Sequence, residues 1–227
     1  MNEKVLIFDS STLISFAMNG LFEEIKKLKS IFKGKFIITG EVKREIIDKP
    51  LTIKRFELEA LRLRQLLNDK ILEMPSSLGI DNKEISEKSQ EFLEKINNSF
   101  MSKGRNLTII DSGESTCLAL SHILNKKKIS NVIALDERTT RMICEKPENL
   151  KKLLQKKLHT SVDIKNKNFK EFKEFKIIRS SELIYVAYKK NLVNLKNGQV
   201  LDALLYAVKF KGCAISGDEI REIKGLK

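Results

Sequence analysis

The chain has 227 residues, of which 41% are hydrophobic, so it can bury a sizeable core in one large domain or two small ones. Its 43 basic and 30 acidic residues give a formal net charge of +13, which favours a polyanionic partner such as nucleic acid. Lys greatly outnumbers Arg, and a general lysine bias would produce the same charge without such a partner.

The cysteines and histidines are few and widely spaced. Cys117, Cys144 and Cys213 form no CxxC pair, and only two histidines accompany them, so neither a disulfide framework nor a zinc site is indicated. The sequence shows no secretory h-region and no apolar run of about 18 residues. We therefore expect no membrane segment and a reducing, cytoplasmic location.

The first part of the chain alternates between strand and helix patterns. Residues 4–8 (KVLIF) predict a strand, followed by a helical pattern through about residue 29. Residues 35–39 (KFIIT) predict a second strand, and residues 41–48 are helical again. Such alternation is typical of a parallel sheet with helices on its faces.

Residues 51–106 interrupt this alternation, and we interpret them as a helical elaboration rather than a separate domain. Residues 51–68 have apolar side chains at helical spacing, and residues 70–75 look extended. Residues 81–103 predict an amphipathic helix. Its expected buried side consists of Ile85, Phe92, Leu93, Ile96 and Phe100.

The alternation resumes with a predicted strand at 107–110 (LTII) and its helix, then a strand at 131–135 (NVIAL) and its helix. A last strand at 175–180 precedes helical segments over 180–224. The predicted fold class is therefore α/β, with a central parallel sheet of four to five strands. We expect a single domain over residues 1–227.

Residues 151–176 are the most basic segment, with nine lysines against three acidic residues and a local net charge of +6. One interpretation is a surface that follows the phosphates of RNA, with Lys165, Lys167, Lys170 and Lys173 as contacts. The other is an ordinary solvated helix and loop.

Acidic residues follow the predicted strands. Asp9 ends the first strand, Glu41 comes just after the second, and Asp136 ends NVIAL, while Asp111 and Glu114 open the helix after LTII. The turns between strands and helices of a parallel sheet fall on one edge, so these acids are expected to converge there.

Each acid also suits the start of a helix, and Asp111 with Glu114 matches a capping box. Packed together, however, the carboxylates would raise one another's pKa unless a cation lay among them, and such oxygen ligands suit Mg²⁺ or Mn²⁺. A divalent ion lowers the pKa of a bound water and neutralises charge on phosphoryl oxygens. With a basic surface nearby, this pattern favours hydrolysis of phosphate esters.

The same residues resemble the motifs of PIN-domain nucleases. The resemblance rests on IFDSSTLI, TGEVKREI, DSGESTCLAL and LDERTTR, in that order, and covers residues 5–48 and 107–143. The segments RSSELIYVAYKKNLV and LDALLYAVKFKGCAISGDEI resemble the C-terminal tail of one intracellular subgroup. Residues 51–106 and 146–174 lie outside the resemblance.

The resemblance implies a three-layer α/β/α sandwich and a Mg²⁺- or Mn²⁺-dependent endoribonuclease. The implied partners are RNA, a second copy of the chain and an antitoxin-type protein. The residues it assigns to the acidic site are Asp9, Glu41, Glu114 and Asp136, with Asp111 as a fifth ligand or a helix cap, and with Ser11, Thr12 and Arg141 in support.

Two other functions stay open at this stage. One is a non-catalytic PIN-like protein that binds RNA or associates with the ribosome, in which the acids cap helices. The other is a haloacid dehalogenase-like phosphatase, which is disfavoured because Ser11 stands where a second acid is needed. With three Tyr and no Trp, we expect no aromatic platform for stacking bases.

Overall fold

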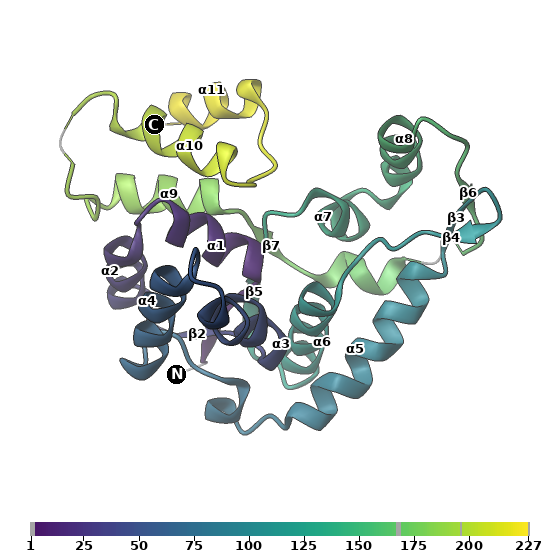
Figure 1. Ribbon diagram of the computed structural model, residues 1–227, viewed down its shortest axis with the longest axis horizontal. Coiled ribbons are helices and arrows are strands. Elements are labelled where there is room, and N and C mark those ends of the chain that lie inside the picture. The colour runs from purple at the N-terminus through teal and green to yellow at the C-terminus, as the bar shows by residue number, and fades with distance from the viewer. Residues whose placement is uncertain (1–2, 167–168, 196, 227) are drawn as a thin grey trace.

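A four-stranded parallel sheet lies at the centre of the computed structural model, which describes residues 3–166, 169–195 and 197–226 (Figure 1). The strand order is β2-β1-β5-β7. The strands are β1 (Lys4–Phe8), β2 (Lys35–Ile37), β5 (Ser130–Ala134) and β7 (Ile177–Ile178). The predicted α/β class with a parallel sheet is confirmed.

Strand β1 occupies the middle of this sheet because its side chains are apolar on both faces, as parallel strands require. Residues 5–8 are all buried. Phe8 pairs with Ala134 of β5, and both strands run in the same direction. The residues that follow the two strands, Asp9 and Asp136, therefore emerge at one edge of the sheet.

Helices cover both faces of the sheet. α6 packs against β1 and β5 with α5 outside it, while α2 and α9 lie over the opposite face (Figure 1). In chain order, the helices are α1 (Ser10–Met18), α2 (Phe22–Ile31), α3 (Gly40–Lys43), α4 (Glu57–Asn68), α5 (Asn82–Asn97), α6 (Ser112–Lys126), α7 (Arg138–Glu145), α8 (Pro147–Leu158), α9 (Ser180–Lys189), α10 (Val200–Phe210) and α11 (Gly217–Gly225).

Shorter helical turns join these elements. A π-helical turn, Arg44–Asp48, continues α3, and 3-10 turns lie at Pro50–Thr52, Pro75–Leu78 and Lys170–Glu174. The segment expected to be extended at 70–75 contributes one parallel bridge, between Glu73 and Ile37 of β2.

The predicted strand at 107–110 does not form within the part of the chain that the structure describes. The side chain of Asn97 takes the place of a neighbouring strand there. Its Oδ1 accepts hydrogen bonds from the backbone N–H groups of Ile109 (2.8 Å) and Ile110 (3.1 Å), and its Nδ2 donates to the Ile110 carbonyl (3.1 Å). A polar side chain thus satisfies the backbone that a sheet would otherwise pair.

A second, antiparallel sheet was not predicted. Its strand order is β4-β3-β6, and its strands are β3 (Phe100–Ser102), β4 (Arg105–Asn106) and β6 (Asp163–Ile164). Phe100 therefore lies in a strand, and the amphipathic helix ends at Asn97 rather than near residue 103. Strands of two or three residues are too short to show a period of two in the sequence.

This small sheet brings the 51–106 elaboration together with the basic segment. Phe92 of α5 packs edge to face on Phe172, with ring centroids 5.0 Å apart. Phe100 of β3 stacks on Phe169 at 5.7 Å. A continuous cluster of buried apolar residues extends from β1 into this region. Among the helices of the described residues, none combines the length and apolarity needed to cross a membrane.

Candidate functional site

The hydroxyl of Ser11 joins the ends of the two central strands. It donates to Asp9 Oδ2 (2.6 Å) and accepts from the backbone N–H of Asp136 (3.1 Å). The Ser11 N–H also donates to Asp9 Oδ2 (3.0 Å), so Asp9 is the N-cap of α1. The predicted convergence of Asp9 and Asp136 is therefore observed, and one predicted supporting residue links them.

Asp136 is anchored from the other side by α9. Its Oδ1 accepts a hydrogen bond from the N–H of Ser180 (2.8 Å), the first residue of that helix. Burial raises the pKa of Asp136, and the charge of Arg141 on α7 opposes that rise. Arg141 also donates from Nη1 to the Ala214 carbonyl (3.5 Å) and pairs through Nε with Glu145 at 3.7 Å. Its supporting role in the site stays a prediction.

Asp111 and Glu114 form the predicted capping box at the start of α6. Glu114 N–H donates to Asp111 Oδ1 (2.9 Å), and Asp111 N–H donates to Glu114 Oε2 (3.0 Å). Glu114 is buried, with 6% of its surface exposed, whereas Asp111 is exposed. A helix cap and a place in the acidic cluster are therefore compatible at this position.

Glu45, rather than Glu41, joins this acidic cluster. The Glu41 carboxylate is half-exposed and pairs with Arg44 at the surface. The Glu45 carboxylate instead lies against the start of α6, where its Oε2 would be 2.8 Å from a Cβ placed on Gly113. Glycine at 113 therefore leaves room for Glu45.

Helical spacing alone does not separate the two acids, because Glu41 and Glu45 are four residues apart and residues at that spacing lie on the same side of an α-helix. The backbone changes between them from α3 to the π-helical turn that begins at Arg44. The contact of Glu45 with the start of α6 and the pairing of Glu41 with Arg44 decide which acid faces the cluster. The sequence interpretation selected Glu41 because it is the acid nearest the end of the strand.

Burial and mutual repulsion raise the pKa values of the clustered acids. Burial, followed by the charges of Asp111, Asp9 and Glu137, raises the pKa of Glu114 to about 9. Burial, reinforced by Asp111 and Glu45, raises the pKa of Asp9 to about 6 despite the hydrogen bonds from Ser11. Burial also raises the pKa values of Asp136 and Glu45.

Two carboxylate oxygens of the cluster have no hydrogen-bond partner within the part of the chain that the structure describes. Burial raises the pKa of Asp136, and the Ser180 and Cys213 side chains lie close enough to that carboxyl group to oppose the rise. Asp9 Oδ1 and Asp136 Oδ2 are both buried and without a partner in the structure. A buried acceptor without a partner costs about 1–3 kcal/mol, and more when it is charged. A proton or a cation would remove that cost at each oxygen.

The donor chemistry of the cluster fits a hard divalent cation, because all of its groups are carboxylates. The described residues nevertheless contain no group of three or more His, Cys, Asp and Glu side chains placed to hold a metal ion. Closing a ligand shell would therefore need the carboxylates to draw together.

Thr12 lies beside the cluster but does not contact it through a hydrogen bond. The side chain is buried, and its Oγ1 has no partner within the described structure. The predicted supporting role therefore falls to Ser11 among the hydroxyls that follow β1.

A groove of about 290 Å³ opens beside Glu114. Asp111 and Glu114 form one wall, Glu137 and Thr139 at the start of α7 form another, and α8 contributes Lys157. Glu137 caps α7 by accepting from the Thr140 N–H (2.8 Å). The sequence interpretation omitted Glu137, although it is adjacent to Asp136. Lys157 belongs to the basic segment 151–176 but was not among the four lysines predicted to contact RNA.

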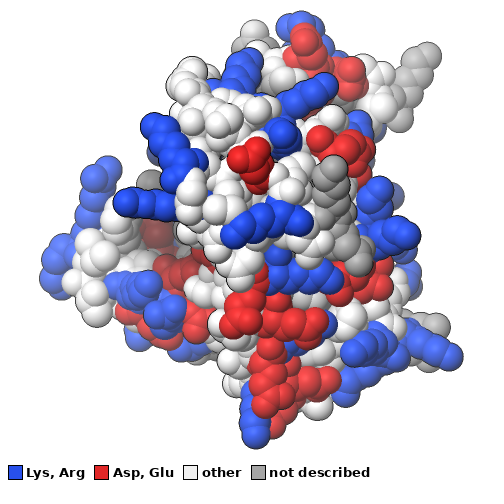
Figure 2. Space-filling view, turned by 90° about the vertical axis from the view of Figure 1, so that its right-hand side faces the viewer, with Lys and Arg blue, Asp and Glu red and all other residues white. Residues whose placement is uncertain are grey.

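The lysines predicted to bind RNA lie elsewhere on the lobe formed by α8 and the small sheet. Lys165, Lys170 and Lys173 are exposed, and Lys170 and Lys173 line a separate hollow with Phe169. Lys167 is outside the described residues. Figure 2 faces the side with α8 and α5, and it shows basic side chains above and around a group of acidic ones.

Comparison with known proteins identifies no relative. No family model matches the chain, and no curated protein or solved structure matches it significantly. The functional argument therefore depends on the geometry of the site.

Proposed function

We propose that the protein is a divalent-metal-dependent endoribonuclease of the PIN type, with its active site at the carboxyl edge of the parallel sheet. One observation carries the proposal. Two buried carboxylate oxygens without hydrogen-bond donors, on Asp9 and Asp136, lie at adjacent strand ends that Ser11 ties together.

The acids of the cluster divide into two roles under this proposal. Asp9 and Asp136 would hold Mg²⁺ or Mn²⁺ through their unpartnered oxygens, and Glu114 and Glu45 would approach from α6 and the π-helical turn. When bound, the ion supplies charge stabilisation for the phosphoryl oxygens and an activated water. Ser11 orients Asp9 by donating a short hydrogen bond to it.

The groove beside Glu114 suits the phosphate backbone of RNA. Lys157 places a positive charge at this groove, across from the carboxylates. Lysine binds a phosphate as a point charge and reads no base, so backbone contacts of this kind position a strand without selecting its sequence.

Cleavage of labelled single-stranded RNA with Mn²⁺ or Mg²⁺ tests the proposal. Asp9→Asn, Glu114→Gln and Asp136→Asn should each lower the rate by about 100-fold or more, as should EDTA. Cleavage that survives EDTA or these substitutions would rule the site out.

Glu45→Gln and Glu41→Gln form a matched pair. The Glu45 variant should lower the cleavage rate at least tenfold, since that carboxylate faces Asp9 and Asp111. The Glu41 variant should keep most of the activity, because its carboxylate pairs with Arg44. Equal losses in the two variants would contradict the assignment of Glu45.

The alternative is a non-catalytic protein that binds RNA. It predicts RNA binding with no metal-dependent cleavage, and no effect of the three substitutions on binding beyond their change in charge. The same assay therefore distinguishes the two functions.

A further inference from the structure

Helix α10 presents two aromatic rings to solvent. Phe210 is 78% exposed, which is the largest fraction among the exposed large hydrophobic residues of the described structure, and Tyr206 is 37% exposed. The other large apolar residues of α10 are buried. A single exposed apolar residue is normal, but here two rings one helical turn apart lie side by side.

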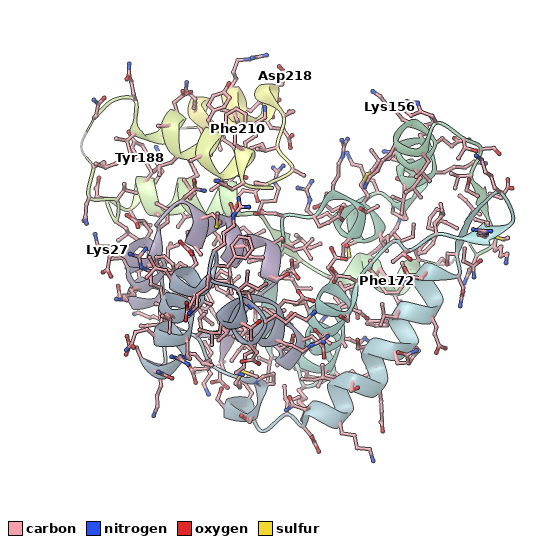
Figure 3. All side chains as sticks on the ribbon, in the orientation of Figure 1. Lys27, Lys156, Phe172, Tyr188, Phe210 and Asp218 are labelled. Atoms are coloured by element: carbon pink, nitrogen blue, oxygen red, sulfur yellow. The ribbon has the colours of Figure 1, made fainter. Side chains whose placement is uncertain are left out.

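The two rings form a continuous aromatic surface. Their centroids are 6.1 Å apart, and their planes differ by 29°. Phe210 is the more exposed ring of the pair and can offer a π face to a planar group. Figure 3 shows Phe210 on the C-terminal helical part of the molecule, together with Asp218 of α11.

Two lysines, Lys209 and Lys211, lie next to these rings in the sequence. Lys209 Nζ lies 5.6 Å from the centroid of the Tyr206 ring, and Lys211 is exposed directly after Phe210. Neither lysine forms an ion pair with any residue that the structure describes. The acid of α10, Asp202, is already paired with Lys224. The charge therefore suits an anionic partner.

The chain leads from this surface directly to the acidic site. After Phe210 it turns at Gly212, whose φ of +114° favours glycine, and reaches Ala214. The Ala214 N–H donates to the Asp136 carbonyl (3.4 Å), and its own carbonyl accepts from Arg179 (3.4 Å). Four residues span at most about 14 Å, so the backbone of Phe210 lies within that distance of Ala214, which contacts Asp136 of the acidic cluster.

We propose that Tyr206 and Phe210 are a stacking platform for bases of single-stranded RNA, with Lys209 and Lys211 binding the neighbouring phosphates. This inference rests on the proposed function, because it takes RNA as the substrate. It differs from the expectation from the sequence that the chain has no aromatic platform for stacking bases.

The chemistry favours an unpaired strand over a duplex. Bases inside a duplex are already stacked on one another, whereas unpaired bases are free to stack on aromatic side chains. Stacking tolerates any base, so the platform would favour single-stranded segments without fixing their sequence.

Fluorescence anisotropy with short labelled single-stranded RNA, measured in EDTA, tests the platform without cleavage. Phe210→Ala and Phe210→Leu should weaken binding by about tenfold, because both remove the π face. Phe210→Trp should retain the affinity of the wild type. Duplex RNA of equal length should bind the wild type and the Phe210 variants alike.

Ile53→Ala is the matched control, since Ile53 is an exposed apolar residue (46%) in the bend that follows the Pro50–Thr52 turn. It should leave RNA affinity unchanged. Thermal unfolding of each variant checks that the protein still folds. We expect little change in Tm for the Phe210 variants, because this side chain is exposed.

Equal affinity of the wild type and Phe210→Ala would overturn the platform. The platform would also be overturned if Phe210→Ala altered the oligomeric mass of the protein but left its affinity for RNA unchanged. The rings would then lie in an interface between copies of the chain. Failure of the proposed function gives a different result: no cleavage with Mn²⁺, together with binding in EDTA that still depends on Phe210.

Discussion

The starts of α6 and α11 have the same local motif, but the pKa of the glutamate in that motif is shifted in opposite directions. Each is a capping box with Glu as its third helical residue: Asp111 with Glu114 in α6, and Ser216 with Glu219 in α11. Burial and neighbouring acids raise the pKa of Glu114 to about 9. Burial alone would raise the pKa of Glu219 too, but hydrogen bonds from Ser216 and Arg179 lower it to about 2.

The difference comes from what each helix start faces. Glu219 is partly exposed and meets the guanidinium of Arg179 at 2.6 Å. Glu114 is buried among Asp9, Asp111 and Glu137, with no ion pair from any described residue. The same capping geometry is therefore a stabilising feature in α11, whereas in α6 it leaves charge that a proton or a cation must neutralise.

The largest expected effect is on stability as a function of pH. The folded state binds protons at Glu114 and Asp9 more tightly than the unfolded state does, so in EDTA the free energy of unfolding should fall as pH rises from about 4 to about 9. For Glu114 the upper bound is on the order of 6 kcal/mol. Urea unfolding across this pH range measures the slope.

Glu114→Gln should flatten that slope and stabilise the protein above neutral pH. Glu219→Gln is the matched control, because the pKa of Glu219 is lowered rather than raised and its pH dependence of stability has the opposite sign. Glu219 contributes stability above about pH 4.5 that is lost as pH falls towards about 2. Solvent screening limits that contribution to about 1 kcal/mol. A Glu114→Gln protein with an unchanged slope would contradict the raised pKa.

The second effect is stabilisation by a divalent cation. Mn²⁺ at about 100 times its Kd should stabilise the fold by about 2.7 kcal/mol. The shift in Tm should be larger near pH 8 than near pH 5, because protons compete for the same carboxylates. Asp136→Asn should abolish the shift, and Glu219→Gln should keep it. An equal shift in both variants would place the cation elsewhere.

The third effect is the difference in stability between removing the Ser11 hydroxyl and removing the adjacent Thr12 hydroxyl. Ser11→Ala removes the bridge between Asp9 and Asp136 and leaves the Asp136 N–H without its partner, so it should cost about 1–3 kcal/mol. Thr12→Val should be neutral or slightly stabilising, because Thr12 Oγ1 is buried without a partner. Chemical denaturation measures both. A larger cost for Thr12→Val would mean that its hydroxyl has a role in the cluster.

The smallest effect concerns lysines near and away from the groove. Lys157→Ala should lower the affinity for single-stranded RNA by a few-fold and reduce the salt slope of log K by about 0.7. Lys173→Ala should change both less, because Lys173 lines a different hollow. Salt titrations of RNA binding compare the two. A greater loss for Lys173 would instead support the predicted RNA contacts at Lys165, Lys167, Lys170 and Lys173.

Much of the site was predictable because strand ends and helix caps are local. Asp9 and Asp136 follow apolar runs that could only be buried strands, and Asp111 with Glu114 is a capping motif readable over four residues. Helical spacing does not distinguish Glu45 from Glu41, which is four residues away, and the contact of Glu45 at Gly113 depends on a second helix far along the chain.

Other features needed three-dimensional context. The pattern LTII predicts a strand, yet the side chain of Asn97 pairs its backbone instead. The small antiparallel sheet joins segments some sixty residues apart, which no local pattern indicates. Nothing in the sequence around Phe210 distinguishes it from the apolar residues of α10 that are buried, and only packing left it in solvent.

By itself, the sequence determined the α/β alternation, the central parallel strands and the acids at their ends, because hydrophobic period and capping act over a few residues. The tertiary structure decided which acids meet, which lysine reaches the groove and which aromatics stay exposed. Those outcomes depend on contacts between distant segments. Two capping boxes with Glu at the same position thus acquire opposite pKa shifts, since burial and neighbouring charge, unlike a cap, are properties of the whole fold.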